Sequence, residues 1–465
     1  MTFTIFRIAR PSNARMPSGT GGTKPACVLA LGLAAFASQP IDARAQGAPA
    51  QQAYSVTALD PPAGYTDSHP IGLNAAGDIA GYSGTSGFLW KNGVKTDLGN
   101  FHAPFPSTNA TLGLALNAAR QVVGWSTIAV FGLDHQRAFV WQNGVMSELQ
   151  TLPNYLDSQA NGINTSGQVV GDTWHPIGGS GTRALLWRGG VAQDLGTLGG
   201  LASTAKAIND GGQIVGSSFL ADHTTAHAFV WQNGAMKDLG ALGKGTFSVA
   251  SAINGAGEIV GVSTFAGPGQ LQDRHAFVYR GGVMTDLGVP GPNLVESAAS
   301  GINQSGTIVG NSGALAYVDQ AGVWTDLNTL VPQHSGITLT SANAINDAGQ
   351  IVATGTRDTS RLGRYAFLLT PVAGSSVPPA PHGLAATAVT GKVTLRWQAS
   401  AGATQGYTVK RYPLSGGPYQ TIATSVVATS YIDTSLPLNQ YYYVVAADND
   451  FGESRTSNEV HVNIP

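Results

Sequence analysis

A nine-residue segment of the form Ile-Asn-x-x-Gly-x-Ile-Val-Gly recurs seven times, and this repeat limits the possible folds more than any other feature of the chain. The asparagines of the repeats are spaced 43 to 49 residues apart and stand at Asn74, Asn117, Asn164, Asn209, Asn254, Asn303 and Asn346. A period of this length is typical of architectures in which one small unit is repeated and stacked against its neighbours.

Each repeat is expected to form four short antiparallel strands. The first strand ends at the Ile-Asn pair, and Asn-x-x-Gly predicts a type I turn, with Gly supplying positive φ. The Ile-Val-Gly run is the second strand, and aromatic stretches such as HAFVWQNG (227–234) are the third. The Asn-Gly or Gly-Gly pair that follows favours a type I′ hairpin turn into a fourth strand, such as VMTDLG (283–288).

Seven units of four strands predict an all-β fold, a seven-bladed β-propeller. The seventh repeat has no fourth strand after YAFLLTP (365–371), whereas a strand at residues 54–60 precedes the first repeat and matches the fourth-strand pattern. We expect this N-terminal strand to complete the seventh blade and close the ring, because closure removes exposed sheet edges. The alternative is an open β-solenoid, in which the two ends lie far apart.

The tripeptide His-Ala-Phe occurs at 227–229 and 275–277 within the third strands. Through these repeats, residues 54–371 resemble the bacterial HAF-repeat extracellular proteins. The resemblance implies export and supplies no catalytic residue. The chain departs from the tripeptide where Arg137, Arg183 and Tyr365 occupy the His position.

Residues 1–45 have the pattern of a signal peptide. Basic residues precede an apolar run at 26–37, and Ala43-Arg44-Ala45 gives a small-x-small cleavage site. The run of twelve residues is shorter than the roughly 20 needed to span a bilayer. Translation starting at Met16 is an alternative to Met1. We therefore expect a protein that is secreted, periplasmic or on the cell surface, with no transmembrane segment after the signal is removed.

Removal of this segment changes both charge and redox chemistry. Five of the 24 basic residues and one of the 26 acidic residues lie in it, which leaves an excess of six acidic residues. A mildly acidic chain without a basic run is not expected to bind nucleic acid or anionic membranes. The single cysteine, Cys27, is removed with the signal, so we expect no disulfide. We expect a monomer and no cofactor.

A second domain is expected after the repeats. Residues 46–373 would form the propeller, the Pro-rich segment 374–381 a linker, and residues 382–465 a further set of alternating strands. The last segment resembles a fibronectin type III domain through Pro381, Leu384, Trp397, Tyr407, Gly416-Gly417-Pro418-Tyr419 and the tyrosines before Val444. This resemblance implies that Trp397 is a core residue and that Tyr441 or Tyr443 makes the corner hydrogen bond of such sandwiches.

Function is expected in the loops that vary between repeats, because recurring residues are mainly architectural. The acids of the fourth strands and the tryptophans of the third recur, so we interpret them as structural. The loops after the second and fourth strands share one face of a propeller and differ in length. The candidate ligand-binding residues on that face are Phe101, His102, Asp134, His135, Trp174, His175, Asp222 and His223.

These residues do not have the spacing of a known catalytic or metal site. Adjacent Asp-His pairs point to opposite sides of a strand, and neither a His-x-His, a His-Glu-x-x-His nor a Gly-x-Ser-x-Gly pattern is present. We therefore predict no catalytic residue and no metal ligand. The sequence favours a non-catalytic binding or scaffold protein for a surface glycan or a protein. The alternative is a polysaccharide-active enzyme, a glycoside hydrolase or lyase, which the appended fibronectin-like module suggests.

Overall fold

A computed structural model describes residues 52–61, 65–101, 110–130, 133–175, 181–265, 273–290, 296–320, 322–332, 335–357, 364–437 and 439–464. The expected signal peptide (1–45) and the candidate residue His102 lie outside these ranges. Apart from one short 3₁₀-helix, η2 (Leu327–Thr329), every regular element in this part of the chain is a β-strand. The all-β prediction is therefore confirmed.

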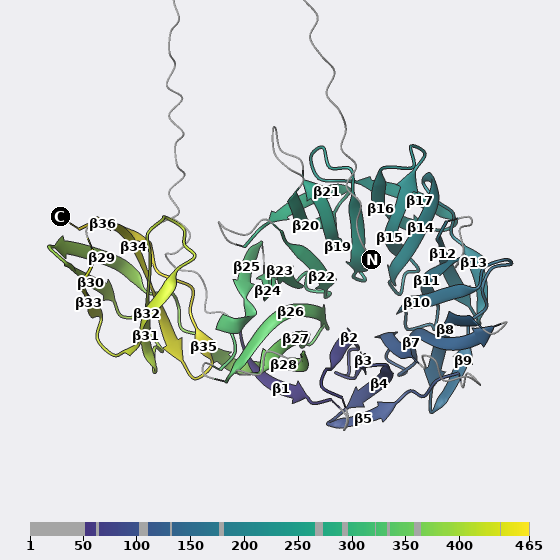
Figure 1. The fold of residues 1–465 in the computed structure, drawn as a ribbon, viewed down its shortest axis with the longest axis horizontal. Helices are drawn as coiled ribbons and strands as arrows, with labels where there is room; N and C mark the ends of the chain where they lie inside the picture. The colour runs from purple at the N-terminus through teal and green to yellow at the C-terminus, as the bar shows by residue number, and fades with distance from the viewer. Residues whose placement is uncertain are drawn as a thin grey trace, which may run out of the picture. The chain divides into compact units, whose positions relative to one another are not determined.

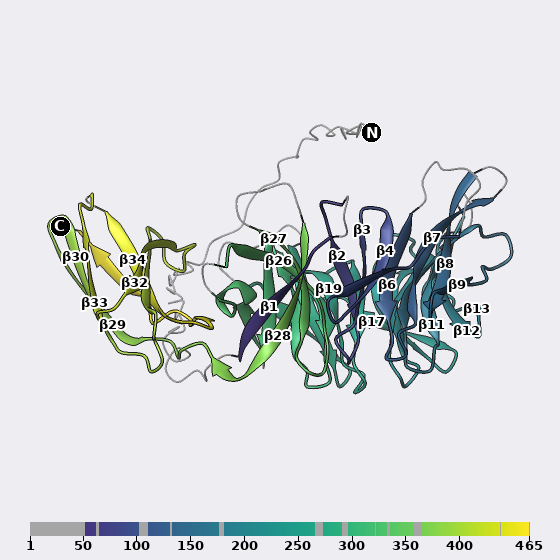
Figure 2. The ribbon, with the colours of Figure 1, turned by 90° about the horizontal axis from the view of Figure 1, so that it is seen from below.

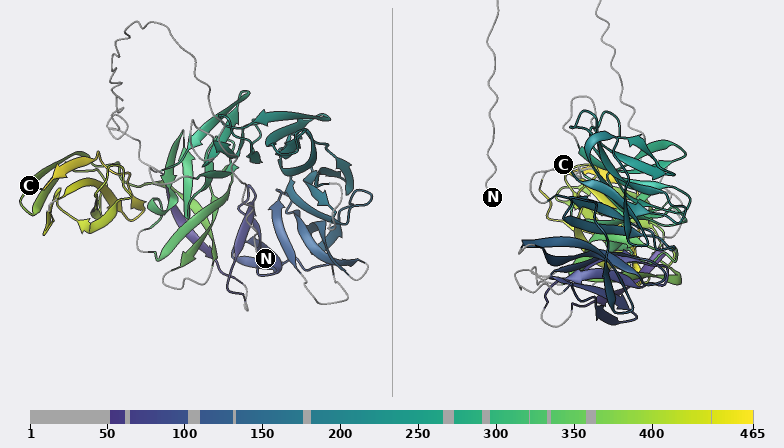
Figure 3. Two further views of the ribbon diagram at one scale, coloured as in Figure 1. Left: turned by 45° about the horizontal axis from the view of Figure 1, so that its top comes forward. Right: turned by 90° about the vertical axis from the view of Figure 1, so that its right-hand side faces the viewer.

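The repeats form seven four-stranded antiparallel sheets (Figure 1). The first six sheets contain, in chain order, β2–β5 (His69–Leu73, Ile79–Ser83, Ser86–Lys91, Val94–Asp97), β6–β9 (Thr111–Leu116, Val122–Val130, Leu133–Gln142, Val145–Glu148), β10–β13 (Asp157–Ile163, Val169–Trp174, Arg183–Arg188, Val191–Asp194), β14–β17 (Gly199–Ile208, Ile214–Leu220, Ala226–Gln232, Ala235–Gly240), β18–β21 (Ser248–Ile253, Ile259–Phe265, Asp273–Arg280, Val283–Gly288) and β22–β25 (Ala298–Ile302, Ile308–Ser312, Leu315–Gln320, Val323–Asp326). In each of these six sheets, strands that are consecutive in the sequence are also hydrogen-bonded neighbours, so each of these repeats forms one sheet. The first strands lie nearest the common centre and the fourth strands lie outermost (Figures 1 and 3).

The seventh sheet joins segments from the two ends of the repeat region. It consists of β26 (Ile337–Ile345), β27 (Ile351–Arg357), β28 (Tyr365–Ser376) and β1 (Gln52–Leu59). β1 runs antiparallel to β28, with Tyr54 opposite Pro371 and Leu59 opposite Ala366 (Figure 2). The predicted pairing of the N-terminal strand with residues 365–371 is confirmed. β28 continues to Ser376, so it includes the first residues of the segment expected to be a linker.

Both predicted turns are present. The Gly of Asn-x-x-Gly has positive φ in six repeats, for example +73° at Gly212, and Arg120 takes this position in the second repeat with φ +60°. In the five Asn-Gly and Gly-Gly hairpin turns both residues have positive φ, as at Asn233 (+52°) and Gly234 (+87°), which is the type I′ geometry. Local turn chemistry therefore determines how each repeat folds back on itself.

In six of the seven repeats the last residue of the segment is Gly, and a bulge in the first strand favours this residue. In every sheet the register between the first two strands shifts by one residue, as between Ala160 and Gly162 of the third sheet. The bulge brings a carbonyl against the second strand, so that a Cβ on Gly171 would lie 2.0 Å from the Gln159 oxygen. A side chain at Gly171 would therefore clash with the backbone of its own sheet, whereas the seventh repeat, which has the same bulge, carries Ala353 at the equivalent position.

The His-Ala-Phe position connects the third strand to the fourth. Nδ1 of His227 lies 3.0 Å from both carboxylate oxygens of Asp238, and Asp238 also accepts a hydrogen bond from the Gly240 amide (2.7 Å). The equivalent ion pairs in other sheets are Arg137–Glu148 (3.1 Å), Arg183–Asp194 (2.9 Å) and His275–Asp286 (2.9 Å). Arginine at the His position thus keeps the same contact. The expectation that the fourth-strand acids are structural agrees with these bonds.

Apolar cores fill the spaces between neighbouring sheets. Phe229 and Trp231 of the fourth sheet, 0% and 4% exposed, pack against Val170 and Leu186 of the third. Burying side chains of this size stabilises the fold by roughly 1.5–3 kcal/mol each. The recurring tryptophans of the third strands are therefore core residues rather than a surface platform.

The seven repeated asparagines link the sheets into one continuous series of hydrogen bonds. Each side-chain amide donates to the backbone oxygen of the next asparagine, from Asn74 to Asn117 (3.2 Å) through to Asn303 and Asn346 (3.2 Å). Asn346 in turn donates to the oxygen of Asn74 (3.0 Å). The series therefore returns to its starting residue, and we refer to it as the asparagine ring.

The C-terminal domain contains two antiparallel sheets. One consists of β29 (His382–Val389), β30 (Lys392–Gln398) and β33 (Ser430–Thr434), and the other of β31 (Gly406–Tyr412), β32 (Gln420–Val426), β34 (Gln440–Asn449), β35 (Gly452–Glu453) and β36 (Val460–Asn463). Trp397 is buried against Tyr407, with ring centroids 5.3 Å apart. Of Tyr441 and Tyr443, which were considered for the corner bond, Tyr443 donates to a side chain, the Asp433 carboxylate (2.8 Å). A third tyrosine, Tyr407, bonds to the backbone instead and accepts from the Ser400 amide (2.9 Å).

Candidate functional site

The structure brings four of the candidate residues together where the second and third sheets meet. Trp174 is the last residue of β11 and lies opposite Asp157, the first residue of β10. Nδ1 of His135, in β8 of the second sheet, lies 3.3 Å from the Asp157 carboxylate. Trp174 is partly exposed and His175, the next residue, is exposed. We call Asp134, His135, Trp174 and His175, with Asp157, the 2–3 junction.

His135 corrects one expectation, because it is not a surface-loop residue. It lies inside β8 and is 4% exposed, and its partner Asp157 is 5% exposed. Asp157 also accepts a hydrogen bond from the backbone amide of Gln136 in the second sheet (2.7 Å). Its carboxylate therefore links the third sheet to the second. Asp134, the neighbour of His135, is exposed. Within this pair only Asp134 is therefore placed to meet a ligand from solvent.

Phe101 packs into the interior between sheets. Its ring lies edge-on to that of Phe139, with centroids 6.5 Å apart, and it joins the core that contains Leu98 and Trp141. This contact gives Phe101 a structural role that was not expected from its loop position. Its predicted companion His102 lies outside the described residues.

Asp222 and His223 form a tight turn between β15 and β16. The Asp222 carboxylate accepts hydrogen bonds from the amides of Thr224 (3.0 Å) and Thr225 (2.9 Å) and from the Thr225 hydroxyl (2.5 Å). These bonds, that of the Thr225 hydroxyl above all, lower the pKa of Asp222 well below its usual range. His223 has a φ of +58°. Both are exposed on the fourth sheet, where Asp222 is already used to hold the turn.

A polar cluster that the candidate list omitted continues from the 2–3 junction along the third sheet. Asp172 lies opposite Gln159 and accepts hydrogen bonds from Gln159 (3.2 Å) and from Asn161 (2.7 Å). Asn161 also donates to the Ala205 oxygen of the fourth sheet (2.8 Å). Burial raises the pKa of Asp172, although the positive charge of Lys206 and these hydrogen bonds act in the opposite direction.

A sequence signal for this cluster exists. Asn161 and Lys206 each stand three residues before a repeated asparagine, at the bulge of the first strand. The seven residues at this position differ in chemistry although their surroundings repeat: Ile71, Leu114, Asn161, Lys206, Ser251, Ser300 and Asn343. The architecture does not require one residue type at this position, and the position lies in a strand rather than in the loops where function was expected.

A separate hollow of about 250 Å³ lies where the seven Asn-x-x-Gly turns meet. Every repeat contributes its asparagine, the aliphatic residue before it and the residue after it. The asparagine amides are used in the ring, and the carboxylates of Asp210 and Asp347 accept bonds from the amides of Thr165 and Gln304 (2.9 Å each). Because these polar groups hold neighbouring turns together, we interpret this hollow as architectural.

Two features are absent from the described residues. These residues contain no group of three or more His, Cys, Asp or Glu side chains arranged to hold a metal ion. They also include no helix with the length and apolar character needed to span a bilayer. The 2–3 junction offers a partly exposed indole, that of Trp174, and an exposed imidazole, that of His175, next to the buried pair of His135 and Asp157.

Comparisons with known proteins find similarity to parts of the chain, and no family model matches it. An amylopullulanase of Thermoanaerobacterium saccharolyticum is 37% identical over 78 residues, which are 17% of this chain and 6% of the relative, so the chain covers only a small part of that protein's length. An Fn3-like protein from Clostridium thermocellum is 41% identical over 19% of this chain and 96% of that chain, with a TM-score of 0.18. The extracellular domain of a putative hybrid two-component system from B. thetaiotaomicron is 9% identical over 90% of this chain and 58% of that chain, with a TM-score of 0.43. The structural neighbours thus include Fn3-like domains and extracellular domains.

Proposed function

We propose that this chain is a secreted or cell-surface protein that binds a glycan without catalysis. In this proposal residues 1–45 are a signal peptide, 46–373 a closed seven-bladed β-propeller of the HAF-repeat type, 374–381 a linker, and 382–465 a fibronectin type III-like domain. The closed ring is supported by the pairing of β1 with β28 and by the bond from Asn346 to Asn74. The glycan is supported by the partial similarity to an amylopullulanase.

The observation that carries the binding site is Trp174. It is a partly exposed aromatic residue at the end of β11, an inner strand of the third sheet, whereas Trp187 and Trp231, in the third strands, are buried core residues. Its strand is fixed by the pairing of Trp174 with Asp157, whose carboxylate contacts the second sheet. An aromatic face held on a rigid frame gives a sugar ring a stacking surface at low entropic cost.

The test is a glycan array probed with the mature protein, followed by titration of the best glycan against Trp174→Ala with His175→Ala. We expect affinity to fall at least tenfold while far-UV circular dichroism and melting stay nearly unchanged. Trp231→Ala is the comparison, since removal of this buried side chain should cost about 3–5 kcal/mol of stability. If the Trp174 and His175 variant unfolds as readily as Trp231→Ala, Trp174 is a core residue and the site is wrong.

The same array separates a binder from an enzyme. Incubation of each bound glycan with the protein should release no shorter product, because a pair of acids is needed and two of the carboxylates near Trp174, those of Asp157 and Asp172, are buried and used in hydrogen bonds, which leaves Asp134 as the exposed one. Appearance of cleaved glycan that disappears in Asp172→Asn would establish the enzyme instead. Binding to no glycan on the array, together with binding to a purified cell-surface protein in a separate assay, would assign a protein ligand.

A further inference from the structure

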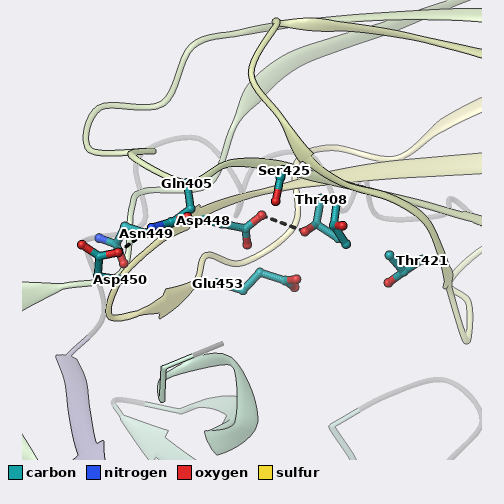
Figure 4. A pocket seen from close by; sticks show the side chains of 9 residues that line it. Gln405, Thr408, Thr421, Ser425, Asp448, Asn449, Asp450 and Glu453 are labelled. Carbon is teal, nitrogen blue, oxygen red and sulfur yellow. Dashed lines mark hydrogen bonds between the residues drawn. The ribbon is translucent and has the colours of Figure 1, made fainter. Parts of the chain in front are cut away.

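The C-terminal domain carries a polar pocket of about 280 Å³ that the sequence analysis did not identify. It lies on the outer face of the sheet formed by β31, β32, β34 and β35, because Thr408 lines it while the adjacent Tyr407 and Val409 belong to the domain core. Four hydroxyl, two amide and three carboxylate side chains line the pocket, and Figure 4 shows them arranged along it. None of the lining residues is aromatic, aliphatic or basic.

The carboxylates are held in position by neighbours within the same domain. Asp448 accepts a hydrogen bond from the Thr408 hydroxyl (2.7 Å), and Asp450 accepts one from the Gln405 amide (2.5 Å). Glu453, which is 8% exposed, forms an ion pair with Lys410. A carboxylate has about four acceptor positions, so the bond from Gln405 orients Asp450 and leaves it able to accept hydroxyl donors. The pocket is thus preorganised before any ligand arrives.

We propose that this pocket is a second binding site and that it takes one ring of a neutral saccharide. A sugar offers several hydroxyl groups that both donate and accept, which matches an acceptor-rich wall interspersed with side-chain hydroxyls and amides. The volume is just below the roughly 300 Å³ at which sites for drug-sized ligands begin, so it suits a small ligand or one unit of a chain. The site lies in a different domain from the 2–3 junction and does not depend on the function proposed for that surface.

The geometry of the ligand groups decides against a metal ion as the occupant. The described residues contain no cluster of three acids or other ligands with metal-binding geometry. Lys410 already balances Glu453, and the six neutral lining groups outnumber the three carboxylates. Recognition should therefore rest on hydrogen bonds between neutral ligand groups and fixed acceptors. Such bonds are insensitive to salt, unlike the pairing of exposed charges.

The experiment uses the full mature chain with labelled threonine methyl groups. Glucose, maltose and cellobiose are titrated, and the NMR signals of Thr408, Thr421 and Thr424, which line the pocket, report local binding. We expect these signals to shift with at least one saccharide, equally at low and high salt. Asp450→Asn and Thr424→Val, at exposed positions, should each weaken this binding about tenfold. Thr387→Val, at an exposed position of the opposite sheet, is the matched control and should leave it unchanged.

Two results would overturn the proposal. One is the absence of any shift of the pocket threonines with all three saccharides while the protein remains folded. The other is a shift produced only by lysine methyl ester and lost at high salt, which would make the pocket a cation site. The Trp174 and His175 variant should bind saccharide in the pocket as the wild type does. A failure of the 2–3 junction is therefore distinguishable from a failure of this site.

Discussion

At the level of single residues, the fourth position of each Asn-x-x-Gly turn requires a left-handed backbone conformation. Six repeats place Gly there and one places Arg120, whose φ is +60°. Nε of Arg120 donates to the carboxylate of Asp78 in the preceding repeat (2.8 Å), and Asp78 is 3% exposed. The ion pair to a buried carboxylate offsets the conformational strain, which is about 1–2 kcal/mol for a residue with a Cβ.

Substitutions at Gly212 isolate that strain. Its φ is +73°, and an added Cβ would meet only Gln168 Oε1, at 4.0 Å, so no clash contributes. Gly212→Ala should lower the free energy of unfolding by about 1 kcal/mol, whereas Gly212→Asn should lower it less because Asn tolerates this conformation. Urea unfolding of both variants measures the difference. Equal stability of the Ala variant and the wild type would mean that this turn is not left-handed in solution.

Asp172 gives stability a dependence on pH. Burial raises its pKa in the folded state, so the folded protein keeps this proton to a higher pH than the unfolded chain does. The contribution of Asp172 to stability should therefore be largest below the ordinary aspartate pKa of about 4, and should fall as the pH rises towards the folded-state pKa. Asp172→Asn, which cannot ionise, should lack this fall. The free energy of unfolding, measured in urea at each pH of this range, should change less with pH for the variant than for the wild type. The same pH dependence for both proteins would rule out the raised pKa.

At the level of single elements, β1 occupies the place that the fourth strand holds in the other sheets. Tyr54, at its start, is 2% exposed and joins the core of the sixth and seventh sheets, and its amide donates to the Leu330 oxygen (2.9 Å). Without β1, the outer edge of β28 would present unpaired backbone groups, which recruit other chains. Deletion of residues 54–60 should therefore cause aggregation as well as loss of stability.

A cross-link tests this pairing directly. Ser55 lies opposite Thr370, and Cα atoms of opposed antiparallel residues are about 4.5–5.5 Å apart, within the range that a disulfide spans. Ser55→Cys with Thr370→Cys in the mature protein should form an intramolecular bond spontaneously and raise the melting temperature under oxidising conditions only. Free thiols that persist after oxidation, measured with a thiol reagent, would favour the open solenoid.

The repeat predicted the strands and their pairing because each turn is set by residues that are adjacent or three apart, as at Asn209 and Gly212. The environment of His135 was beyond this reasoning, since its burial depends on Asp157, 22 residues later and in the next sheet. The same holds for Asn161, whose bond to Ala205 joins two repeats. Sequence spacing describes contacts within a repeat well, while the candidate site is made of contacts between repeats.

At the level of the whole molecule, the asparagine ring couples all seven sheets. Asn209 and Asn346 make equivalent contacts within this ring and can be compared directly. Each is 6% exposed, donates to a Gln four residues later (2.8 Å) and donates to the next asparagine oxygen (3.0 Å). They differ in that Asn209 links consecutive repeats, whereas Asn346 links the seventh repeat to the first.

The two alanine variants therefore measure closure. If the ring is closed, Asn209→Ala and Asn346→Ala should lower the free energy of unfolding by similar amounts, about 1–3 kcal/mol, because each leaves buried polar groups without partners. In an open array the bond from Asn346 to Asn74 would be absent. Asn346→Ala would then be clearly the milder change in urea unfolding, and that result would contradict the closed propeller.

The antiparallel pairing of β1 and β28 also determines how the repeat region responds to mechanical force. Gln52, where β1 begins, lies beside Ser376, where β28 ends, so the chain enters and leaves at the same end of the paired strands. Tension between residues before β1 and residues after β28 would load the hydrogen bonds one at a time, starting from Gln52, rather than all together. Under such a pull β1 should peel off at low force and expose the edge of β28. The repeat region would therefore resist force far better when it is attached through only one of these two chain segments than when it is stretched between them.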